Sequence, residues 1–278
     1  MGRFWSLLFL LVPVFGVGTF IVAATPNTLL VNHWLPENIS ETGGVIDGLF
    51  MFILWLTGII FIGTGVALFW FLWKYDSERT TEPVKYMHGS HTLEVVWSIL
   101  PAATLLFIAI FQMDAFADAK IRRPIQSAGP DGIEGTADDV PQPLLVEVTG
   151  RQFEWRIRYA GKDGLLYTTD DVHTVNELHI PVDEVVVVAI QSEDVLHSFF
   201  LPNMRVKQDV VPGMQQYVWF RPIRSGEFDI VCAELCGWGH YKMRGRLTVE
   251  SRGQFDAWLQ REFEEQERSE YTPVEDEE

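Results

Sequence analysis

The sequence predicts a membrane-anchored all-β protein, in which apolar helices precede a small soluble β domain. Apolar residues make up 47% of the 278 residues, and the longest apolar runs all lie before residue 115. From residue 144 onwards, short runs rich in Val, Ile, Phe and Trp alternate with Gly, Pro and Asp. The chain is long enough for a membrane anchor and one domain of about 150 residues.

The first apolar run, Phe4–Ala24, follows a single Arg3. Its length suits a membrane span better than the apolar part of an export signal. Val22-Ala23-Ala24 would still serve as a small-residue cleavage site. Residues 1–25 are therefore expected to form an N-terminal apolar helix, which we favour, or a cleaved signal peptide.

Residues 45–119 are predicted to form a transmembrane helical hairpin. Gly48–Trp73 contains no charged residue and is long enough to span a membrane. Val95–Gln112 is also uncharged but shorter, and it spans if the residues just before it lie at the interface. A buried soluble helix is the alternative for the second run.

Positive charge predicts the orientation of this hairpin. Lys74, Arg79 and Lys85 lie between the two spans, so this loop is expected on the cytoplasmic side. Residues beyond 115 then lie outside, whether or not the first run is cleaved. We therefore expect a multi-pass protein of a bacterial-type inner (plasma) membrane, with its soluble domain on the periplasmic or extracellular side.

Residues 120–250 are predicted to form a β-sandwich or barrel, because several short strand-like runs follow one another at regular spacing. These runs are Leu144–Thr149, Phe153–Tyr159, Val185–Gln191, Gln216–Arg221, Glu227–Cys232 and Arg246–Glu250. Residues 251–278 are expected to form a surface helix over Arg252–Arg268, followed by an acidic tail of disordered composition.

Metal-ligand chemistry gathers in one short segment. The two cysteines of the chain, Cys232 and Cys236, are separated by three residues and are followed by His240 and Met243. Thiolate, thioether and imidazole suit copper, whereas zinc takes Cys, His and carboxylate ligands. A disulfide formed outside the cytosol and half of a zinc site are the alternatives. The Glu, His and Met at these spacings favour copper.

A further ligand is needed from outside this segment, and His197 is the best candidate. It lies in Asp194-Val195-Leu196-His197-Ser198, far enough before Cys232 to leave room for a few strands. A histidine satisfied within the core is the alternative. With the remaining ligands on one late loop, a Greek-key barrel of the cupredoxin type is the natural prediction.

These segments resemble subunit II of cytochrome c oxidase, the subunit that carries the dinuclear copper A centre. The family pattern C-x-E-x-C-x-x-x-H-x-x-M is complete from Cys232 to Met243. The patterns D-V-x-H-S-[FW] and K-x-D-x-x-P-G also match, at residues 194–199 and 207–213. The resemblance covers roughly residues 45–250. It implies that both thiolates bridge two coppers, that His197 and His240 bind one copper each, and that Met243 and the Glu234 carbonyl complete the site.

The resemblance also implies an activity, that of cytochrome-c oxidase in respiratory electron transport. The subunit would accept electrons from cytochrome c and pass them to the haem–copper subunit I, which reduces oxygen to water and translocates protons. Expected partners are subunit I, other oxidase subunits, cytochrome c and membrane lipid, with no nucleic acid. The chain has no C-x-x-C-H, so the donor must be a separate protein. Residues 120–278 hold 17 Lys and Arg against 29 Asp and Glu, which would steer a basic donor and also favours solubility.

Three further residues take roles from the resemblance. The Glu234 carboxylate would reach a magnesium ion at the boundary with subunit I, or would be a surface carboxylate. Glu94, in the family's E-x-x-W-[TS]-x-L-P segment, would mark the mouth of a proton pathway or simply favour a helix N-terminus. Phe153 stands where the family has the tryptophan thought to receive the electron. It remains the aligned candidate for that role, but the route and the donor are open, and Trp155 is assigned to core packing.

An internal repeat follows the pattern G-x-D-G-[IL]-x-x-T-x-D-D-V, at residues 129–140 and 161–172. Its carboxylates, including Asp131 and Asp139 in one loop and Asp163 and Asp171 in the other, could hold calcium. Solvated acidic turns are the alternative, since no residue matches the bidentate Glu of an EF-hand loop.

Rival functions fit the sequence less well. Nitrous oxide reductase uses the same copper centre but needs a large His-rich domain, and this chain has seven His. A quinol oxidase subunit of the same fold would lack the copper ligands. A copper carrier would need an exchangeable, exposed site and no paired membrane spans.

Overall fold

The computed structural model describes residues 2–25, 34–76, 83, 86 and 88–268. The chain divides into two units, one formed by residues 1–36 and 47–113, and the other by residues 37–46 and 114–278. Arg79 and Lys85, on which the predicted orientation partly rests, lie outside the described residues, as does the acidic tail from residue 269.

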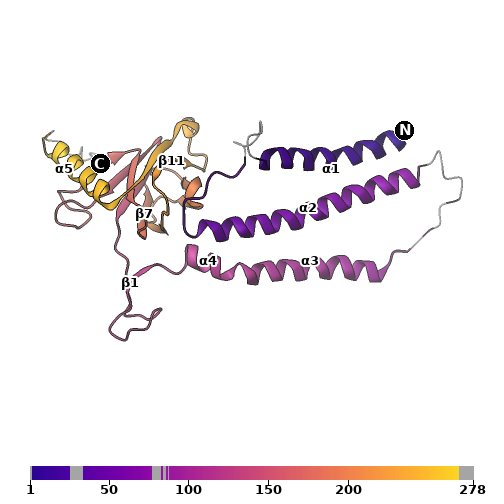
Figure 1. The fold of residues 1–278 in the computed structure, drawn as a ribbon, viewed down its shortest axis with the longest axis horizontal. Helices are drawn as coiled ribbons and strands as arrows, with labels where there is room; N and C mark the ends of the chain where they lie inside the picture. Colours follow the sequence, from indigo (N-terminus) through magenta and orange to yellow (C-terminus); the bar gives the residue numbers. More distant parts are fainter. Residues whose placement is uncertain (1, 26–33, 77–82, 84–85, 87, 269–278) are drawn as a thin grey trace. The chain divides into compact units, whose positions relative to one another are not determined.

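The first unit is helical. Helices α1 (Gly2–Ala24), α2 (Gly43–Lys74) and α3 (His91–Phe111) are each long and apolar enough to cross a membrane (Figure 1). Most of their apolar side chains are exposed, as expected of residues that face lipid. The prediction of a helical hairpin preceded by a further apolar helix is confirmed. The short α4 (Met113–Lys120) follows α3 directly.

The second unit is built on two five-stranded sheets. One has the order β10 (Gln216–Phe220), β7 (Val186–Ser192), β3 (Val146–Arg151), β4 (Glu154–Tyr159) and β5 (Val172–Val175). The other has the order β6 (Glu177–Pro181), β12 (Arg244–Glu250), β11 (Gly226–Cys232), β8 (His197–Leu201) and β9 (Val206–Val210). The pairs β3–β7 and β6–β12 are parallel, and the other pairs are antiparallel.

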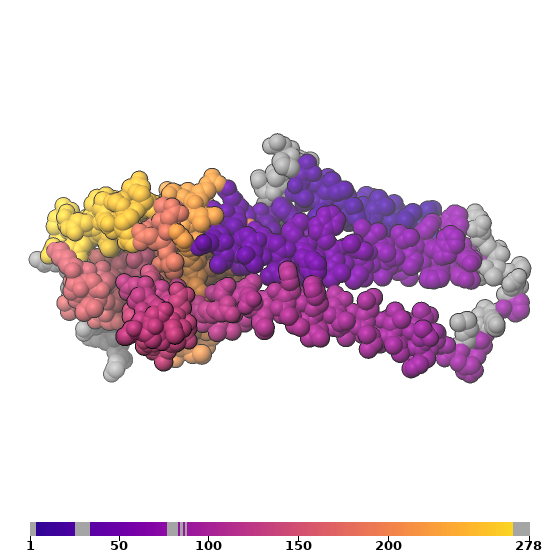
Figure 2. All heavy atoms as spheres, turned by 60° about the horizontal axis from the view of Figure 1, so that its bottom comes forward, coloured from indigo at the N-terminus to yellow at the C-terminus, as the bar shows by residue number. Residues whose placement is uncertain are grey.

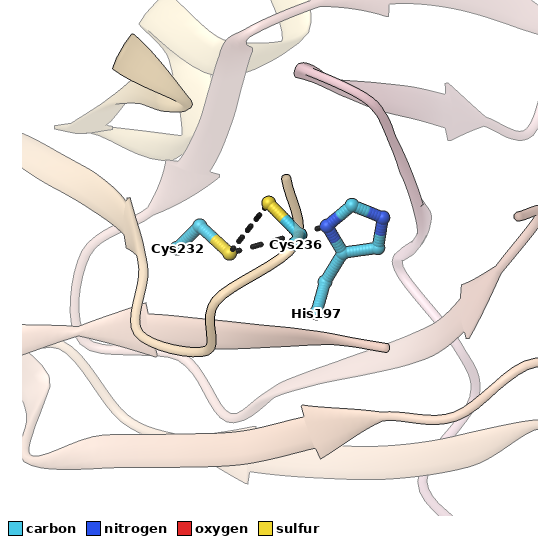
Figure 3. A group of neighbouring side chains, drawn as sticks. All are labelled: His197, Cys232 and Cys236. Atoms are coloured by element: carbon cyan, nitrogen blue, oxygen red, sulfur yellow. Dashed lines mark hydrogen bonds between the residues drawn. The ribbon is translucent and has the colours of Figure 1, made fainter. Parts of the chain in front are cut away.

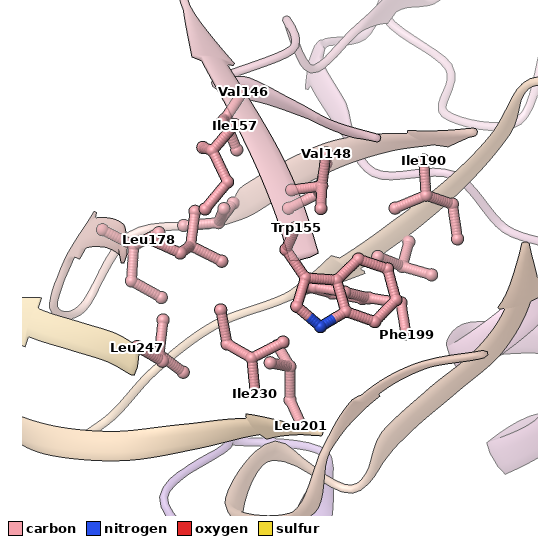
Figure 4. Packing of buried hydrophobic residues seen from close by; sticks show 14 of the residues in the cluster. Val146, Val148, Trp155, Ile157, Leu178, Ile190, Phe199, Leu201, Ile230 and Leu247 are labelled. Carbon is pink, nitrogen blue, oxygen red and sulfur yellow. The ribbon is translucent and has the colours of Figure 1, made fainter. Parts of the chain in front are cut away.

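The core lies between these two sheets, as expected for a sandwich. In β4, buried side chains alternate with partly exposed ones, which places Trp155, Ile157 and Tyr159 on the inner face. Trp155 meets Phe199 of the opposite sheet edge to face, with ring centroids 5.5 Å apart (Figure 4). The predicted all-β domain is thus confirmed. The small hairpin β1 (Ile125–Ser127) with β2 (Val140–Pro141) stands apart from both sheets.

Residues 37–46, which lead into α2 and include its first four residues, belong to the β unit. Ile39 is fully buried in the core. Its backbone N–H donates to the carbonyl of Asn203 at 3.0 Å, and its carbonyl accepts from Ile223 at 2.9 Å. These contacts hold the chain just before α2 against the sandwich.

Helix α5 (Arg252–Arg268) covers part of the β domain surface, where it is drawn in yellow in Figure 2. It spans the segment predicted as a surface helix. Phe255 and Trp258 are its buried residues, and the Trp258 ring stacks on the imidazole of His179 with centroids 3.8 Å apart. The other face carries charge, so the helix is attached by a narrow apolar stripe.

Candidate metal centre

The two sulfur atoms lie side by side at one end of the second sheet. Cys232 ends β11, and Cys236 lies in the connection from β11 to β12. Their Sγ atoms are 3.8 Å apart, and both residues are buried (Figure 3). A disulfide bond would bring the sulfurs to about 2.05 Å. The pair is therefore two free thiols, not the disulfide considered as an alternative.

Each sulfur has its own imidazole neighbour. His197 begins β8 and is fully buried, with its Nδ1 3.9 Å from the Cys232 Sγ. His240 begins the short 3₁₀ helix η3 (His240–Lys242), with its Nδ1 3.6 Å from the Cys236 Sγ. His197 and Cys232, 35 residues apart in sequence, meet because β8 and β11 pair directly in the sheet.

A thioether and a carbonyl complete the gathering. The Met243 Sδ lies 3.7 Å from the Cys236 Sγ, and the Cys232 thiol donates to the Glu234 carbonyl at 3.2 Å. The loop is closed by a backbone bond from the Cys232 N–H to the Met243 carbonyl at 3.1 Å. All six atoms predicted as copper ligands are therefore brought together. In the described part of the chain, His197, Cys232 and Cys236 form the one group of three or more His, Cys, Asp or Glu side chains placed to hold a metal ion.

The turn between β3 and β4 shapes the ligand loop from outside. The Gln152 amide donates to the Cys236 carbonyl. The Phe153 ring packs so closely on the loop that a Cβ on Gly239 would lie 2.5 Å from it. Gly237 adopts a φ of +134°, a conformation that side chains other than glycine rarely accept. The two glycines thus let the loop bend tightly beneath Phe153.

One functional residue was not predicted as such. Asp194 accepts a hydrogen bond from the Nε2 of His197 at 2.8 Å, and its carboxylate also accepts from the backbone N–H groups of Gln152 and Val195. A carboxylate on the far nitrogen orients an imidazole and leaves the other nitrogen for the metal. The D-V-x-H-S segment contained the signal, three residues before the histidine.

The electrostatics of the site favour one thiolate. Burial opposes ionisation of both thiols, but hydrogen bonding to His197 lowers the pKa of Cys232 to about 6. Burial and the adjacent Cys232 thiolate raise the pKa of the Cys236 thiol above its ordinary value. Burial also works against the His197 cation, but its Cys232 and Asp194 partners outweigh burial and raise the pKa of the imidazole. Binding of a metal cation would release the remaining protons.

The aromatic residues near the loop differ in exposure. Trp155 is fully buried and packs among core residues, in line with the packing role expected for it. Phe153 is half-buried. Its ring contacts that of Trp238 edge to face at 5.1 Å, and Trp238 is 81% exposed.

Three predictions remain, for Glu94, for magnesium and for calcium. Glu94 lies in the first turn of α3, exposed and 3.9 Å from the Nδ1 of His91, where a carboxylate suits the helix N-terminus. The magnesium prediction gains no support, because Glu234 joins no cluster of acidic or histidine side chains among the described residues. The calcium prediction gains none either, since the acidic residues of the two loops form no metal-sized group among the described residues.

Comparisons with known proteins identify the family of this chain. The family model for the periplasmic domain of cytochrome c oxidase subunit II matches residues 144–250, and the model for its transmembrane domain matches residues 31–114. The alternative cytochrome c oxidase subunit 2 of Bradyrhizobium diazoefficiens is 42% identical over 139 residues, which are 42% of this chain and 50% of that protein. The cytochrome c oxidase subunit 2 of Thermostichus vulcanus is 28% identical over 82% of this chain and 80% of its own length.

Among solved structures, the periplasmic domain of subunit II of cytochrome oxidase from Bradyrhizobium japonicum matches with a TM-score of 0.40 and 27% identity. The match covers 45% of this chain and 97% of that domain. The two family models together cover most of the chain, from just before α2 to the last strand of the sandwich. The chain belongs to the cytochrome c oxidase subunit II family and carries both its transmembrane and its periplasmic domain.

Proposed function

We propose that the chain accepts electrons from cytochrome c at a dinuclear copper A centre and passes them to the haem–copper subunit I, which reduces oxygen to water. The observation that carries this proposal is the pair of buried sulfurs 3.8 Å apart, each with its own imidazole. A site for a single copper needs one thiolate, whereas two adjacent thiolates with separate imidazoles suit two metal ions.

The donor set fits this metal pair. Cys232 and Cys236 would bridge the coppers, and His197 and His240 would each bind one. Met243, 3.7 Å from the Cys236 Sγ, and the Glu234 carbonyl, 3.2 Å from the Cys232 Sγ, would supply the remaining two donors. When bound, the copper pair supplies a one-electron carrier in which the charge is shared, so that each bond changes little on reduction.

The protein holds this arrangement in place and keeps water out. His197 and Met243 are fully buried, and the thiols are nearly so. Asp194 fixes the ring of His197 from the far side. His197 and Cys232 lie on paired strands of one sheet, and the loop with the other ligands joins two strands of that same sheet. Such a rigid support keeps the geometry similar in both redox states.

The partners follow from the family. Residues 144–250 match the family's periplasmic domain, so cytochrome c would dock on the periplasmic side of the membrane. The excess of carboxylates in residues 120–278 would attract a basic donor. Subunit I would lie beside the apolar helices. Glu94 stays a candidate for a proton pathway in that subunit.

The test is the copper content of the full-length chain, purified in detergent and loaded with copper under reducing conditions. We expect two coppers per chain that share one unpaired electron by electron paramagnetic resonance. Cys232→Ser is expected to abolish this signal, and Met243→Leu to alter it. Met214→Leu changes an exposed methionine outside the group and serves as the matched control. A chain that stays colourless and metal-free would refute the proposal. A single labile Cu(I) would also refute it and would favour a copper carrier.

A further inference from the structure

The ligand loop carries large apolar side chains that point away from the metal site. Leu235, Trp238 and Tyr241 are 77%, 81% and 71% exposed, while the ligands between them are buried or half-buried. Single exposed apolar residues are ordinary on protein surfaces. Three on one short loop, interleaved with metal ligands, are a feature that the copper site itself does not require.

Trp238 has the most direct connection to the site among these residues. It lies two residues after Cys236 and two before His240. Its ring contacts the Phe153 ring at 5.1 Å and an interplanar angle of 68°. Phe153 in turn packs on the glycines on either side of Trp238. The indole, the phenyl ring and the ligand loop therefore form one continuous packed group that reaches from solvent to the metal ligands.

We propose that Trp238 is the residue on which the electron donor docks and through which the electron reaches the metal centre. This proposal rests on the proposed function. One electron would leave the ferrous haem of a c-type cytochrome, which becomes ferric, and would reduce the copper pair by one electron. No bond is made or broken, and no proton moves.

Exposure and chemistry both favour Trp238 over Phe153. A donor that approaches the loop meets the 81% exposed indole before the half-buried phenyl ring. An indole also has a larger and more easily oxidised π system than a phenyl ring. Contacts between redox partners are small, and tryptophan is enriched among the residues that dominate binding at protein interfaces. The excess of carboxylates in residues 120–278 suits a basic partner.

The experiment uses the assembled oxidase with Trp238→Phe and Trp238→Ala. Trp219→Phe is the matched control, since Trp219 is half-buried in β10 and donates to the Asp118 carbonyl, away from the ligand loop. Surface plasmon resonance gives the Kd of a ferric basic c-type cytochrome. Stopped-flow absorbance gives the second-order rate at which the ferrous form reduces the copper centre. The copper absorption spectrum reports whether the site is intact.

We expect Trp238→Ala to raise the Kd and lower the second-order rate by about tenfold each. Trp238→Phe keeps an apolar ring, so it should lower the rate more than it raises the Kd. The copper spectrum and the Trp219→Phe variant should match the wild type. If both Trp238 variants bind and are reduced like the wild type, the inference is wrong while the proposed function stands. If the wild-type complex is not reduced by the cytochrome at all, the proposed function fails and this inference fails with it.

Discussion

Asp194 provides the sharpest test of how the protein holds its metal ligands. Its Oδ1 accepts from the Nε2 of His197 at 2.8 Å and from the Val195 N–H at 2.6 Å, and its Oδ2 accepts from the Gln152 N–H at 2.8 Å. Asp194→Asn keeps the size of the side chain but leaves only one acceptor oxygen. If that oxygen stays toward His197, the new NH₂ group faces the N–H of Gln152.

The size of the effect follows from these contacts. The variant loses one hydrogen bond and opposes two donors, which costs the apoprotein about 1–3 kcal/mol. His197 keeps a neutral partner in place of a charged one. Loss of such support behind a metal-bound imidazole lowers metal affinity by about 10–100-fold, equivalent to about 1.4–2.7 kcal/mol. Asp194→Ala removes all three bonds and should lie at the upper end of that range.

Competitive titration of copper against a chromophoric chelator measures this affinity on the full-length chain. The matched control is Glu193→Gln, which changes the neighbouring carboxylate. Glu193 pairs with Arg151 and Arg156 and makes no contact with His197 among those described. If Glu193→Gln keeps the wild-type copper affinity while Asp194→Asn binds copper at least tenfold more weakly, Asp194 supports His197 as argued. Affinities within twofold of each other for Asp194→Asn and the wild type would refute it.

Three further outcomes follow from other contacts. Gly150→Ala places a methyl group 3.0 Å from the Cδ2 of His197, so copper affinity in the same titration should fall about tenfold. The control Gly253→Ala adds a methyl group with no atom within 4 Å and should bind copper with wild-type affinity. Trp258→Ala empties a buried aromatic site and should lower the free energy of unfolding by about 3–5 kcal/mol in denaturant titration. Burial and a neighbouring guanidinium lower the pKa of His173. In the unfolded chain this histidine has an ordinary pKa of about 6.5, so as pH falls it binds a proton in the unfolded chain before it does in the folded one. Protonation therefore favours unfolding, and Tm should drop between pH 8 and 5, with a smaller drop in His173→Gln.

The ligand loop could be predicted because its information is local. Four of the six donor atoms come from the connection between β11 and β12, and a fifth comes from Cys232 at the end of β11, so their spacing in sequence nearly determines their spacing in space. His197 is the exception, and it was found because the loop needed one more ligand and because its flanking segment matched the family. Direct pairing of β8 with β11 then brings it to the sulfurs.

The residues that support the ligands could not be found in this way. Gln152 reaches the Cys236 carbonyl across 84 residues, and the Gln152 N–H reaches Asp194 across 42. Glutamine and aspartate have no pattern that marks such long-range bonds, because most of them lie on the surface. Ile39 was overlooked for a related reason, since a single apolar residue in a polar segment shows no periodicity, although it lies in the core.

The strands also divide into those that the sequence pattern predicts and those that it does not. The strands β3, β4, β7, β10, β11 and β12 each overlap a predicted run, because buried positions alternate or run together in Val, Ile, Phe and Trp. The strands β5, β6, β8 and β9 were not predicted. β9 reads Val-Lys-Gln-Asp-Val and pairs on one side only, at the sheet edge, so it has little need of apolar residues.

The repeated acidic loops fold into the same turn in both copies. The first aspartate of each loop, Asp131 or Asp163, accepts from the backbone N–H two residues later at 2.8 Å in both copies. The last aspartate, Asp139 or Asp171, accepts from the N–H four residues earlier at 2.7 Å in both copies. Aspartate is favoured in turns because its side chain can bond to the nearby backbone in this way. The repeat therefore forms the same folded turn twice, with these four carboxylates bonded to their own backbone, and the calcium prediction stays without support.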